Sequence, residues 1–459
     1  MTDNFNRNSL LLLFSAVLLF FSPFIYTQEN NAEVILNDVI ALLAGRNFSS
    51  ALELFDKLDP QIAQDTEIQI LRASISNSAG KPSEAIQIAN KIIALDANNT
   101  DALMILADSA SLQNRERDRR NFLEKIISIN PGHARALTDL GNLSLGNRNL
   151  HVAAGYFDRA LAAEPENGEA LVGRAVIHRY NRESQSSERL LNRAAKLYPA
   201  WARPLHERAR LYRSAGFLND ALEDLDFALE LEKDNYWIIT DRGQVLMDMG
   251  KKQEALAAFA RAIEIDPGAF LAYVFSAGIK DELGDYSGSE KDYTKLASLR
   301  PDYYFAFEAI GIFNMKNKNW AKARDAFLEA YKQAPAELTY AMLASICWMR
   351  AGRQTDPKQF LAQVLRTAPR DSFEYAVLKL YHDLNGDIDV ANMIEKETNV
   401  NTKARMIFYL ASFYDIRGSK TLADRYYMLM RDQNASFSLE RRLNEWIIEE
   451  RNLGLKVNQ

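Results

Sequence analysis

The sequence predicts an all-α fold, a solenoid of stacked helical pairs, and three regularities in its 459 residues support this prediction. Prolines recur at intervals of 34 residues or twice that, small residues recur at two fixed places between them, and large apolar residues recur at a third. Because proline disrupts a helix interior, a regularly spaced proline marks the repeated end of a helical unit. The regularly spaced prolines are Pro131, Pro165, Pro199, Pro267, Pro301, Pro335 and Pro369. Lys233 stands at the position between Pro199 and Pro267 where the spacing would place another proline.

With the lattice proline at position 32, nine consecutive units of 34 residues cover residues 66–371. Position 8 is Ala, Gly or Ser in all nine units, position 20 is mostly Ala or Ser, and position 24 is mostly Leu, Phe or Tyr. Positions 4, 7, 8 and 11 share one helical face, and positions 20, 24 and 27 share another. This pattern therefore predicts that each unit forms two antiparallel helices, which cross closely at the small residues.

This pattern resembles the tetratricopeptide repeat, a helix–turn–helix unit of 34 residues. The resemblance rests on the period, the small residues at positions 8 and 20, the large residue at position 24 and the proline at position 32, from Thr66 to Asp371. The frequent Trp at position 4 is replaced by residues such as Leu103 and Phe307. The resemblance implies a right-handed superhelical solenoid whose concave wall is lined by the first helix of each unit.

The pattern weakens at both ends of the chain. Residues 32–58 are expected to form a degenerate first helical pair, and residues 372–437 two divergent units of the same kind. Residues 438–452 carry an apolar stripe opposite a charged face, which predicts a C-terminal capping helix. A stack of repeats needs such a cap because its last unit otherwise exposes its core.

Residues 1–28 are interpreted as a signal peptide or a signal anchor. There is no charge between Arg7 and Glu29, and Leu10–Tyr26 is almost wholly apolar. Such a stretch is long for a signal-peptide core and barely long enough to span a bilayer, and it lacks an Ala-x-Ala cleavage pattern. A cleaved leader, an uncleaved anchor and a buried helix all stay open. The first two predict export of the repeats to the periplasm or to the outer face of the inner membrane, in the cell envelope.

The composition and motifs argue against chemistry and against nucleic acid. A net charge of −6 lacks the basic excess that nucleic-acid binders usually carry. The five histidines show no metal-ligand spacing, and no phosphate-binding glycine loop or G-x-S-x-G motif is present. We therefore expect no catalytic residue, cofactor or metal, and we expect the single cysteine, Cys347, to be a buried and inert thiol.

Three arginines occupy position 7, which is normally apolar, in successive units: Arg174, Arg208 and Arg242. A long arginine can lay its methylene groups along the core and bring its guanidinium to a carboxylate on the second helix, as Asp224 could offer to Arg208. We expect structural ion pairs here, and a ligand site is the alternative.

The candidate binding residues lie on the exposed stripe of each first helix, at positions 2, 5, 9 and 12 with position 13 beside it. In residues 134–235 this stripe is basic, with five arginines against one acid. We call this set the basic groove residues: Arg135, Arg179, Tyr180, Arg203, His206, Arg210 and Arg213. From residue 304 onward the stripe turns apolar, and we call that set the apolar groove residues: Phe305, Ile312, Met315, Met342, Ile346, Met349, Phe373 and Leu380.

Two interpretations of the apolar groove residues stay open. Methionine-rich apolar surfaces suit adaptable binding, so these residues could hold a partner. Alternatively, neighbouring helices or the C-terminal pairs could fill the same channel.

The sequence thus predicts an exported, non-enzymatic scaffold that binds a protein or peptide along the concave groove, the partner combining acidic residues with an apolar stretch. One alternative is a membrane-anchored assembly subunit of an envelope complex, attached through an uncleaved N-terminal segment. The other is an accessory ligand-binding subunit of a transporter or wall enzyme, with a small anion near the arginines.

Overall fold

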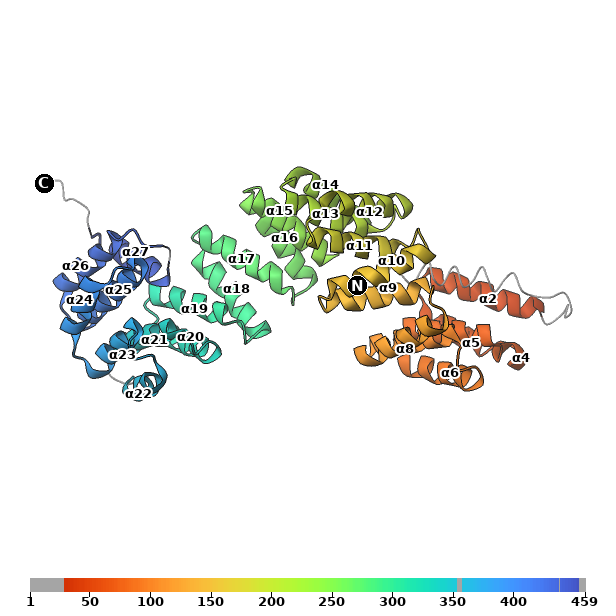
Figure 1. The fold of residues 1–459 in the computed structure, drawn as a ribbon, viewed down its shortest axis with the longest axis horizontal. Coiled ribbons are helices and arrows are strands. Elements are labelled where there is room, and N and C mark those ends of the chain that lie inside the picture. Colours follow the sequence, from red (N-terminus) through yellow and green to blue (C-terminus); the bar gives the residue numbers. More distant parts are fainter. Residues whose placement is uncertain (1–28, 353–356, 437, 454–459) are drawn as a thin grey trace. The chain divides into compact units, whose positions relative to one another are not determined.

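We describe the protein from a computed structural model, in which residues 29–352, 357–436 and 438–453 are described. Every regular element in these ranges is a helix, so the predicted all-α repeat solenoid is confirmed (Figure 1). The predicted signal peptide or anchor, residues 1–28, lies outside the described residues. The chain divides into an N-terminal part up to Lys233 and a C-terminal part from Asp234.

The N-terminal part is a series of helical pairs with one additional short helix, α4. Its helices are α2 (Glu29–Ala44), α3 (Phe48–Phe55), α4 (Pro60–Ala63), α5 (Thr66–Ser78), α6 (Pro82–Leu95), α7 (Thr100–Leu112), α8 (Glu116–Ile129), α9 (Ala134–Gly146), α10 (Leu150–Ala163), α11 (Gly168–Tyr180), α12 (Ser184–Leu197), α13 (Ala202–Ala215) and α14 (Leu218–Leu231).

The C-terminal part continues the pairs and ends on a single helix. Its helices are α15 (Tyr236–Asp248), α16 (Lys252–Ile265), α17 (Phe270–Glu282), α18 (Tyr286–Leu299), α19 (Tyr304–Lys316), α20 (Trp320–Gln333), α21 (Leu338–Arg350), α22 (Lys358–Thr367), α23 (Phe373–Asp383), α24 (Asp387–Lys396), α25 (Val400–Ile416), α26 (Lys420–Arg431) and α27 (Leu439–Glu450).

The start of each unit has a local cause. In all nine units the first helix begins at the unit's first residue, from Thr66 in α5 to Leu338 in α21. Asn99, Asn167 and Asn235 precede three of these helices, and each side chain accepts a hydrogen bond from a backbone N–H of the first turn. Such N-caps satisfy donors that have no partner within the helix.

The two helices of a unit meet where a small residue faces a large one. In three units position 8 is glycine and position 24 is phenylalanine, and a Cβ added to the glycine would lie 2.5–2.6 Å from the ring. These pairs are Gly141 with Phe157, Gly243 with Phe259, and Gly311 with Phe327. Where position 8 is alanine in α7, α11 and α13, position 24 is leucine instead. In these six units the two positions therefore fill a similar combined volume, as close packing requires, whereas Ala277 with Tyr293 and Ala73 with Ala89 depart from it.

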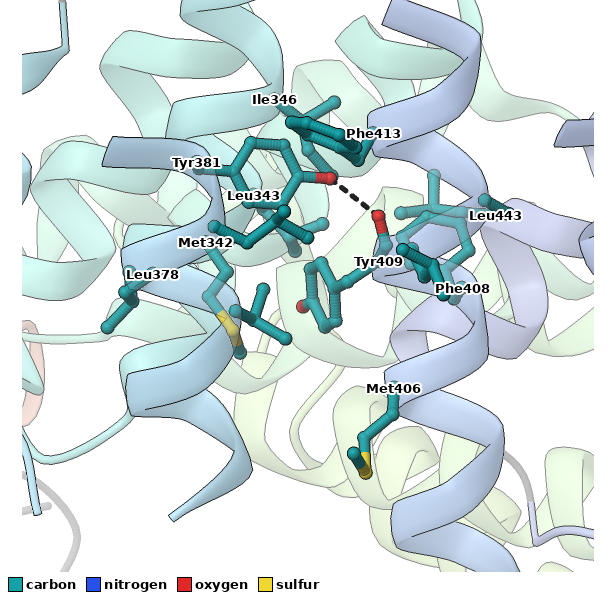
Figure 2. Packing of buried hydrophobic residues seen from close by; sticks show 14 of the residues in the cluster. Met342, Leu343, Ile346, Leu378, Tyr381, Met406, Phe408, Tyr409, Phe413 and Leu443 are labelled. Carbon is teal, nitrogen blue, oxygen red and sulfur yellow. Dashed lines mark hydrogen bonds between the residues drawn. The ribbon is translucent and has the colours of Figure 1, made fainter. Parts of the chain in front are cut away.

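The last helices build the most extensive core of the C-terminal part. The hydroxyl of Tyr381 in α23 donates to the backbone oxygen of Tyr409 in α25 over 2.8 Å, among buried apolar side chains (Figure 2). Glu440 of α27 is also buried and accepts hydrogen bonds from Arg405 Nε at 2.9 Å and from the Tyr409 hydroxyl at 3.0 Å. These bonds tie α27 to α25 and satisfy a carboxylate that would otherwise be costly to bury.

Helix α27 also reaches earlier repeats, which the expectation of a terminal cap with a polar outer face did not include. Arg442 forms a bidentate ion pair with Asp281 at the end of α17. Trp446 packs edge-on against Tyr286 of α18, with 5.4 Å between ring centroids, and Lys316 Nζ of α19 lies 4.3 Å from the Trp446 ring. The cap therefore contacts the repeats that begin at Phe270 and Tyr304 as well as the end of the stack.

The shared volume of positions 8 and 24 generates a stability prediction. Replacing Gly243 with Ala places a methyl group against the Phe259 ring, and we expect it to lower the free energy of unfolding by about 1–3 kcal/mol. Adding Phe259→Leu reproduces the Ala and Leu combination of α11 and α12. The double variant should therefore lose less stability than the sum of the two single variants, measured by urea unfolding followed by circular dichroism.

Gly278 of α17 provides the matched control, because a Cβ added there meets no atom within 4 Å. Gly278→Ala should raise the free energy of unfolding by about 0.5–1 kcal/mol, since glycine is a poor residue in a helix interior. Equal effects of the two alanine substitutions would contradict the packing argument.

Candidate functional site

The basic groove residues of the N-terminal part contact acids on neighbouring first helices. Arg135 of α9 donates from Nη2 to both carboxylate oxygens of Asp108 in α7, at 2.8 and 3.0 Å. Arg203 of α13 forms an ion pair with Glu169 of α11. Both pairs are only partly exposed, so each stabilises the stacking of successive repeats more than an exposed surface pair would.

A second group of charges connects α11 and α13. Glu207 of α13 is largely buried and accepts from Arg179 of α11 at 3.3 Å and from Arg210 at 3.0 Å. The Arg179 guanidinium also lies 5.0 Å from the ring of Tyr180, whose side chain is exposed. Of the remaining basic groove residues, His206 is buried within α13 and Arg213 is engaged in an interaction of its own.

The expectation of an unbalanced basic surface is therefore wrong for Arg135, Arg179, Arg203 and Arg210. The count of one acid against five arginines covered a single stripe within residues 134–235. Asp108 lies in the preceding unit and Glu207 lies at position 6, off that stripe, yet both reach the arginines. Neighbouring helices supply charges that reading one helix at a time does not include.

Two of the three position-7 arginines, Arg174 and Arg208, form the predicted structural ion pairs. Arg208 donates from Nε and Nη2 to the two oxygens of Asp224 on α14, at 2.8 and 2.6 Å, which confirms the predicted partner. Arg174 pairs at 2.7 Å with Asp158, which belongs to the second helix of the preceding unit. An arginine at position 7 can therefore pair with an acid on the second helix of its own unit or on the second helix of the preceding unit.

The apolar groove residues form core instead of an open channel, which corrects the first interpretation and bears out the alternative. Ile312, Met315, Met342, Ile346, Phe373 and Leu380 are buried, and Met349 packs partly buried against the same cluster. Met342 and Ile346 of α21 are covered by α23 and α25 of the same chain, and Phe408 and Phe413 of α25 belong to this cluster (Figure 2). Phe305 is the exception, with 48% of its surface exposed.

Cys347 lies in the same core and is completely buried, as expected. Burial raises the pKa of its thiol well above the ordinary value. The thiolate, which is the reactive form of cysteine, is therefore disfavoured here.

Phe305 belongs to a surface that the sequence reading missed. Trp237, Leu271 and Phe305 occupy position 2 of three successive units, on α15, α17 and α19, and are 37%, 42% and 48% exposed. We call these three residues the position-2 row. In the N-terminal part the same position is charged, as in Arg135 and Glu169. The change from charged to apolar residues at Trp237 lies between the basic stripe of residues 134–235 and the apolar stripe that begins at residue 304.

Two hollows accompany the position-2 row. The first hollow has a volume of about 110 Å³ and is lined by Trp237 and Leu271 together with Tyr236 and Phe270. The second hollow has a volume of about 390 Å³ and includes Phe305 in its wall. Polar and aromatic side chains also line it: Asp281, Tyr293, Tyr303, Glu308 and Arg442. The row thus combines exposed apolar side chains with concave surface, which is the usual character of a recognition site.

Two further properties concern the described residues alone. Within them, no group of His, Cys, Asp and Glu side chains is arranged to hold a metal ion. None of the helices in this part of the chain has the length and apolar character needed to cross a membrane.

Comparison with known proteins identifies the repeat. Two models of the tetratricopeptide repeat match the chain, one at residues 138–200 and 279–337 and the other at residues 239–269. The chain is 25% identical over 247 residues to the CTR9 homolog of Arabidopsis thaliana, covering 48% of this chain and 22% of that protein. It is 24% identical over 187 residues to human tetratricopeptide repeat protein 6, covering 40% of this chain and 36% of that protein. The chain therefore spans about a fifth to a third of these relatives.

Solved structures with a similar fold include PilF of Pseudomonas aeruginosa and the Cut9–Hcn1 assembly of the APC/C. The first has a TM-score of 0.40 and 17% identity, covering 45% of this chain and 95% of that chain. The second has a TM-score of 0.47 and 16% identity, covering 65% of this chain and 58% of that chain.

The charged contacts of the N-terminal part generate a pH prediction. Burial raises the pKa of Asp139 in α9 from 3.8 to about 6, although Arg135 and Arg119 oppose the shift. The folded protein therefore holds a proton that the unfolded chain releases between about pH 4 and pH 6. The contribution of Asp139 to stability should fall across this window as the pH rises, by about 2 kcal/mol, and stay constant above it.

Asp139→Asn should remove this component, so urea unfolding of the two proteins at pH 4.5, 5.5 and 6.5 should give diverging free energies. Parallel values would contradict the prediction.

Proposed function

The chain is a tetratricopeptide-repeat protein, and from that premise we propose that it is a non-enzymatic scaffold that binds a protein or peptide segment on the first helices of its repeats. Solenoids of this kind present one equivalent surface per repeat, so a bound segment contacts several units in succession. The observation that carries the proposal is the position-2 row of the C-terminal part.

Single exposed apolar residues are ordinary on protein surfaces, but the position-2 row has a regularity that single residues lack. Trp237, Leu271 and Phe305 occupy equivalent places on α15, α17 and α19, and the two hollows lie beside them. Exposed apolar patches of this kind favour interaction with a partner, and aromatic residues in hollows dominate binding energy at interfaces. We therefore assign the apolar stretch of the partner to this row.

The predicted acidic component of the partner stays a prediction. Arg135 and Arg203 already contact Asp108 and Glu169, so an acidic segment would have to displace these carboxylates. The same requirement applies to the alternative in which the chain is an accessory subunit that binds a small anion. Among the described residues no charged side chain pairs with the position-2 row in this way, and the scaffold function is therefore the better supported of the two.

The second element of the proposal is export. The apolar stretch Leu10–Tyr26, with Arg7 before it and acids after it, supports export of the repeats to the cell envelope. If the leader is uncleaved, the same scaffold is a membrane-anchored assembly subunit, and a bound partner is held at the membrane surface.

Binding on the position-2 row is tested with the double variant Trp237→Ser and Phe305→Ser. Removing two aromatic side chains that become buried in the complex should cost about 1.5–3 kcal/mol each, so partner association should weaken at least tenfold. The measurement is quantitative pull-down of crosslinked partner from the native envelope, comparing variant with wild type.

Two matched controls remove exposed apolar side chains elsewhere. Phe227→Ser on α14 and Ile388→Ser on α24 change residues that are 58% and 71% exposed and lie on second helices. These variants should recover the partner as wild type does. If they weaken recovery while the double variant leaves it unchanged, binding lies on the second helices and the proposal is wrong.

Export is tested with Leu12→Asp and Leu18→Asp together. Each acid in the apolar stretch disfavours insertion by about 2.5–3.5 kcal/mol, so the chain should stay in the cytoplasm. A reporter that is active only outside the cytoplasm, fused after Gln459, should be active on the wild-type chain and silent on the variant. A silent wild-type fusion together with an active cytoplasmic reporter would contradict export.

A further inference from the structure

The second hollow has a chemical character of its own, distinct from the apolar row that leads to it. We propose that it binds the cationic side chain, lysine or arginine, of the partner segment. This inference rests on the proposed scaffold function and adds the chemistry of one anchor residue.

The hollow is built by four helices of the C-terminal part. Asp281 ends α17, Tyr293 lies on α18, Glu308 lies on α19 and Arg442 lies on α27. Its volume of about 390 Å³ falls in the range that pockets for small groups occupy. Because α27 forms one wall, the hollow exists only where the C-terminal helix returns to the repeats.

The charges of the hollow leave one carboxylate for a ligand. Arg442 donates from Nη1 and Nη2 to the two carboxylate oxygens of Asp281, so these two charges offset each other. Glu308 accepts a hydrogen bond at one oxygen, Oε2, from the hydroxyl of Tyr340 at 2.5 Å. Glu308 lines the hollow, and among the described residues no hydrogen bond to its other oxygen, Oε1, is found, so this oxygen can accept from a ligand donor.

The surroundings of Glu308 favour a cation over a neutral or anionic group. Burial raises the pKa of Glu308, the hydrogen bond from Tyr340 opposes this shift, and the nearby carboxylates of Glu440 and Glu337 add smaller increases. A positive charge placed in the hollow relieves this repulsion and restores the ionised form. An anion would meet the same carboxylates and be repelled.

Aromatic rings complete the recognition of a cation. The rings of Tyr303 and Phe305 lie 5.7 Å apart between centroids and are inclined at 56°. A cation within about 6 Å of such a ring face is attracted to it. A cation–π contact of this kind is already present nearby, because Lys316 Nζ lies 3.8 Å from the Tyr286 ring centroid.

The position of the hollow identifies the cation as part of a peptide segment. Phe305 belongs both to the position-2 row and to the wall of the hollow. The first hollow lies between α15 and α17, one repeat earlier. Packed helices are separated by about 8–10 Å and an extended chain advances about 3.3 Å per residue, so about three residues separate an apolar anchor from the basic one.

The test uses a displayed library of random dodecapeptides, selected in parallel on the full chain, on Trp237→Ser, on Glu308→Gln and on Glu329→Gln. The glutamine keeps an acceptor for Tyr340 and removes only the charge. Glu329 on α20 pairs with Lys332 and lies outside the hollow, so its variant controls for a general loss of charge. Circular dichroism and thermal unfolding establish that all three variants fold.

Peptides whose binding depends on Trp237 should carry lysine or arginine at one fixed place beside an apolar residue. This basic preference should persist on Glu329→Gln and vanish on Glu308→Gln, where the apolar preference remains. One enriched peptide, and the same peptide with norleucine in place of the basic residue, should differ at least tenfold in affinity for wild type and be equal for Glu308→Gln.

The outcomes separate the two proposals. If Trp237-dependent peptides are enriched without a basic preference, or if Glu308→Gln keeps that preference, the cation site is overturned and the scaffold function stands. If no enriched peptide depends on Trp237, the assignment of the position-2 row is overturned together with the cation site.

Discussion

The close crossing of two helices within each repeat is the constraint on which the rest of the structure depends. Gly243 lies so near to Phe259 that even one methyl group does not fit, and Gly141 and Gly311 meet the same limit. Because interiors are packed at nearly crystalline density, the glycine at position 8 makes room for the phenylalanine at position 24 in these three units. Within each of the two parts, the first helices follow one another in a regular series, and side chains at equivalent positions form rows.

The rows on the first helices are charged in the N-terminal part and apolar at the end of the C-terminal part. In the N-terminal part the row is charged, and Arg135, Arg179 and Arg203 contact acids one repeat away, so neighbouring repeats are joined by ion pairs. At the end of the C-terminal part the row is apolar, and α25 packs against it, so Met342 and Ile346 are core. Both arrangements use the first-helix surface to hold the protein together, and neither leaves it open.

The position-2 row lies between these two regions in the sequence and follows neither arrangement. Trp237, Leu271 and Phe305 remain partly exposed, and no cover like that of α25 over Met342 is seen among the described residues. The return of α27 to α17 and α19 gives this stretch a second hollow, with Glu308 and Arg442 in its wall. A capping helix thereby contributes a wall of the site we propose for partner recognition.

The period of the prolines and the small residues at positions 8 and 20 determined, from the sequence alone, the helical pairs and the starts of their first helices. These are local and periodic properties, because each unit repeats the same contacts between residues close in the chain. Sequence also identified Asp224 as the partner of Arg208, because that pair lies within one unit. Only the tertiary structure decided that Asp108 and Glu207 pair with the arginines of the basic groove residues, that α23 and α25 bury Met342 and Leu380, and that Trp237 stays exposed. Those outcomes depend on which distant helix covers a given face, and a helical period reports that a face is apolar without reporting what covers it.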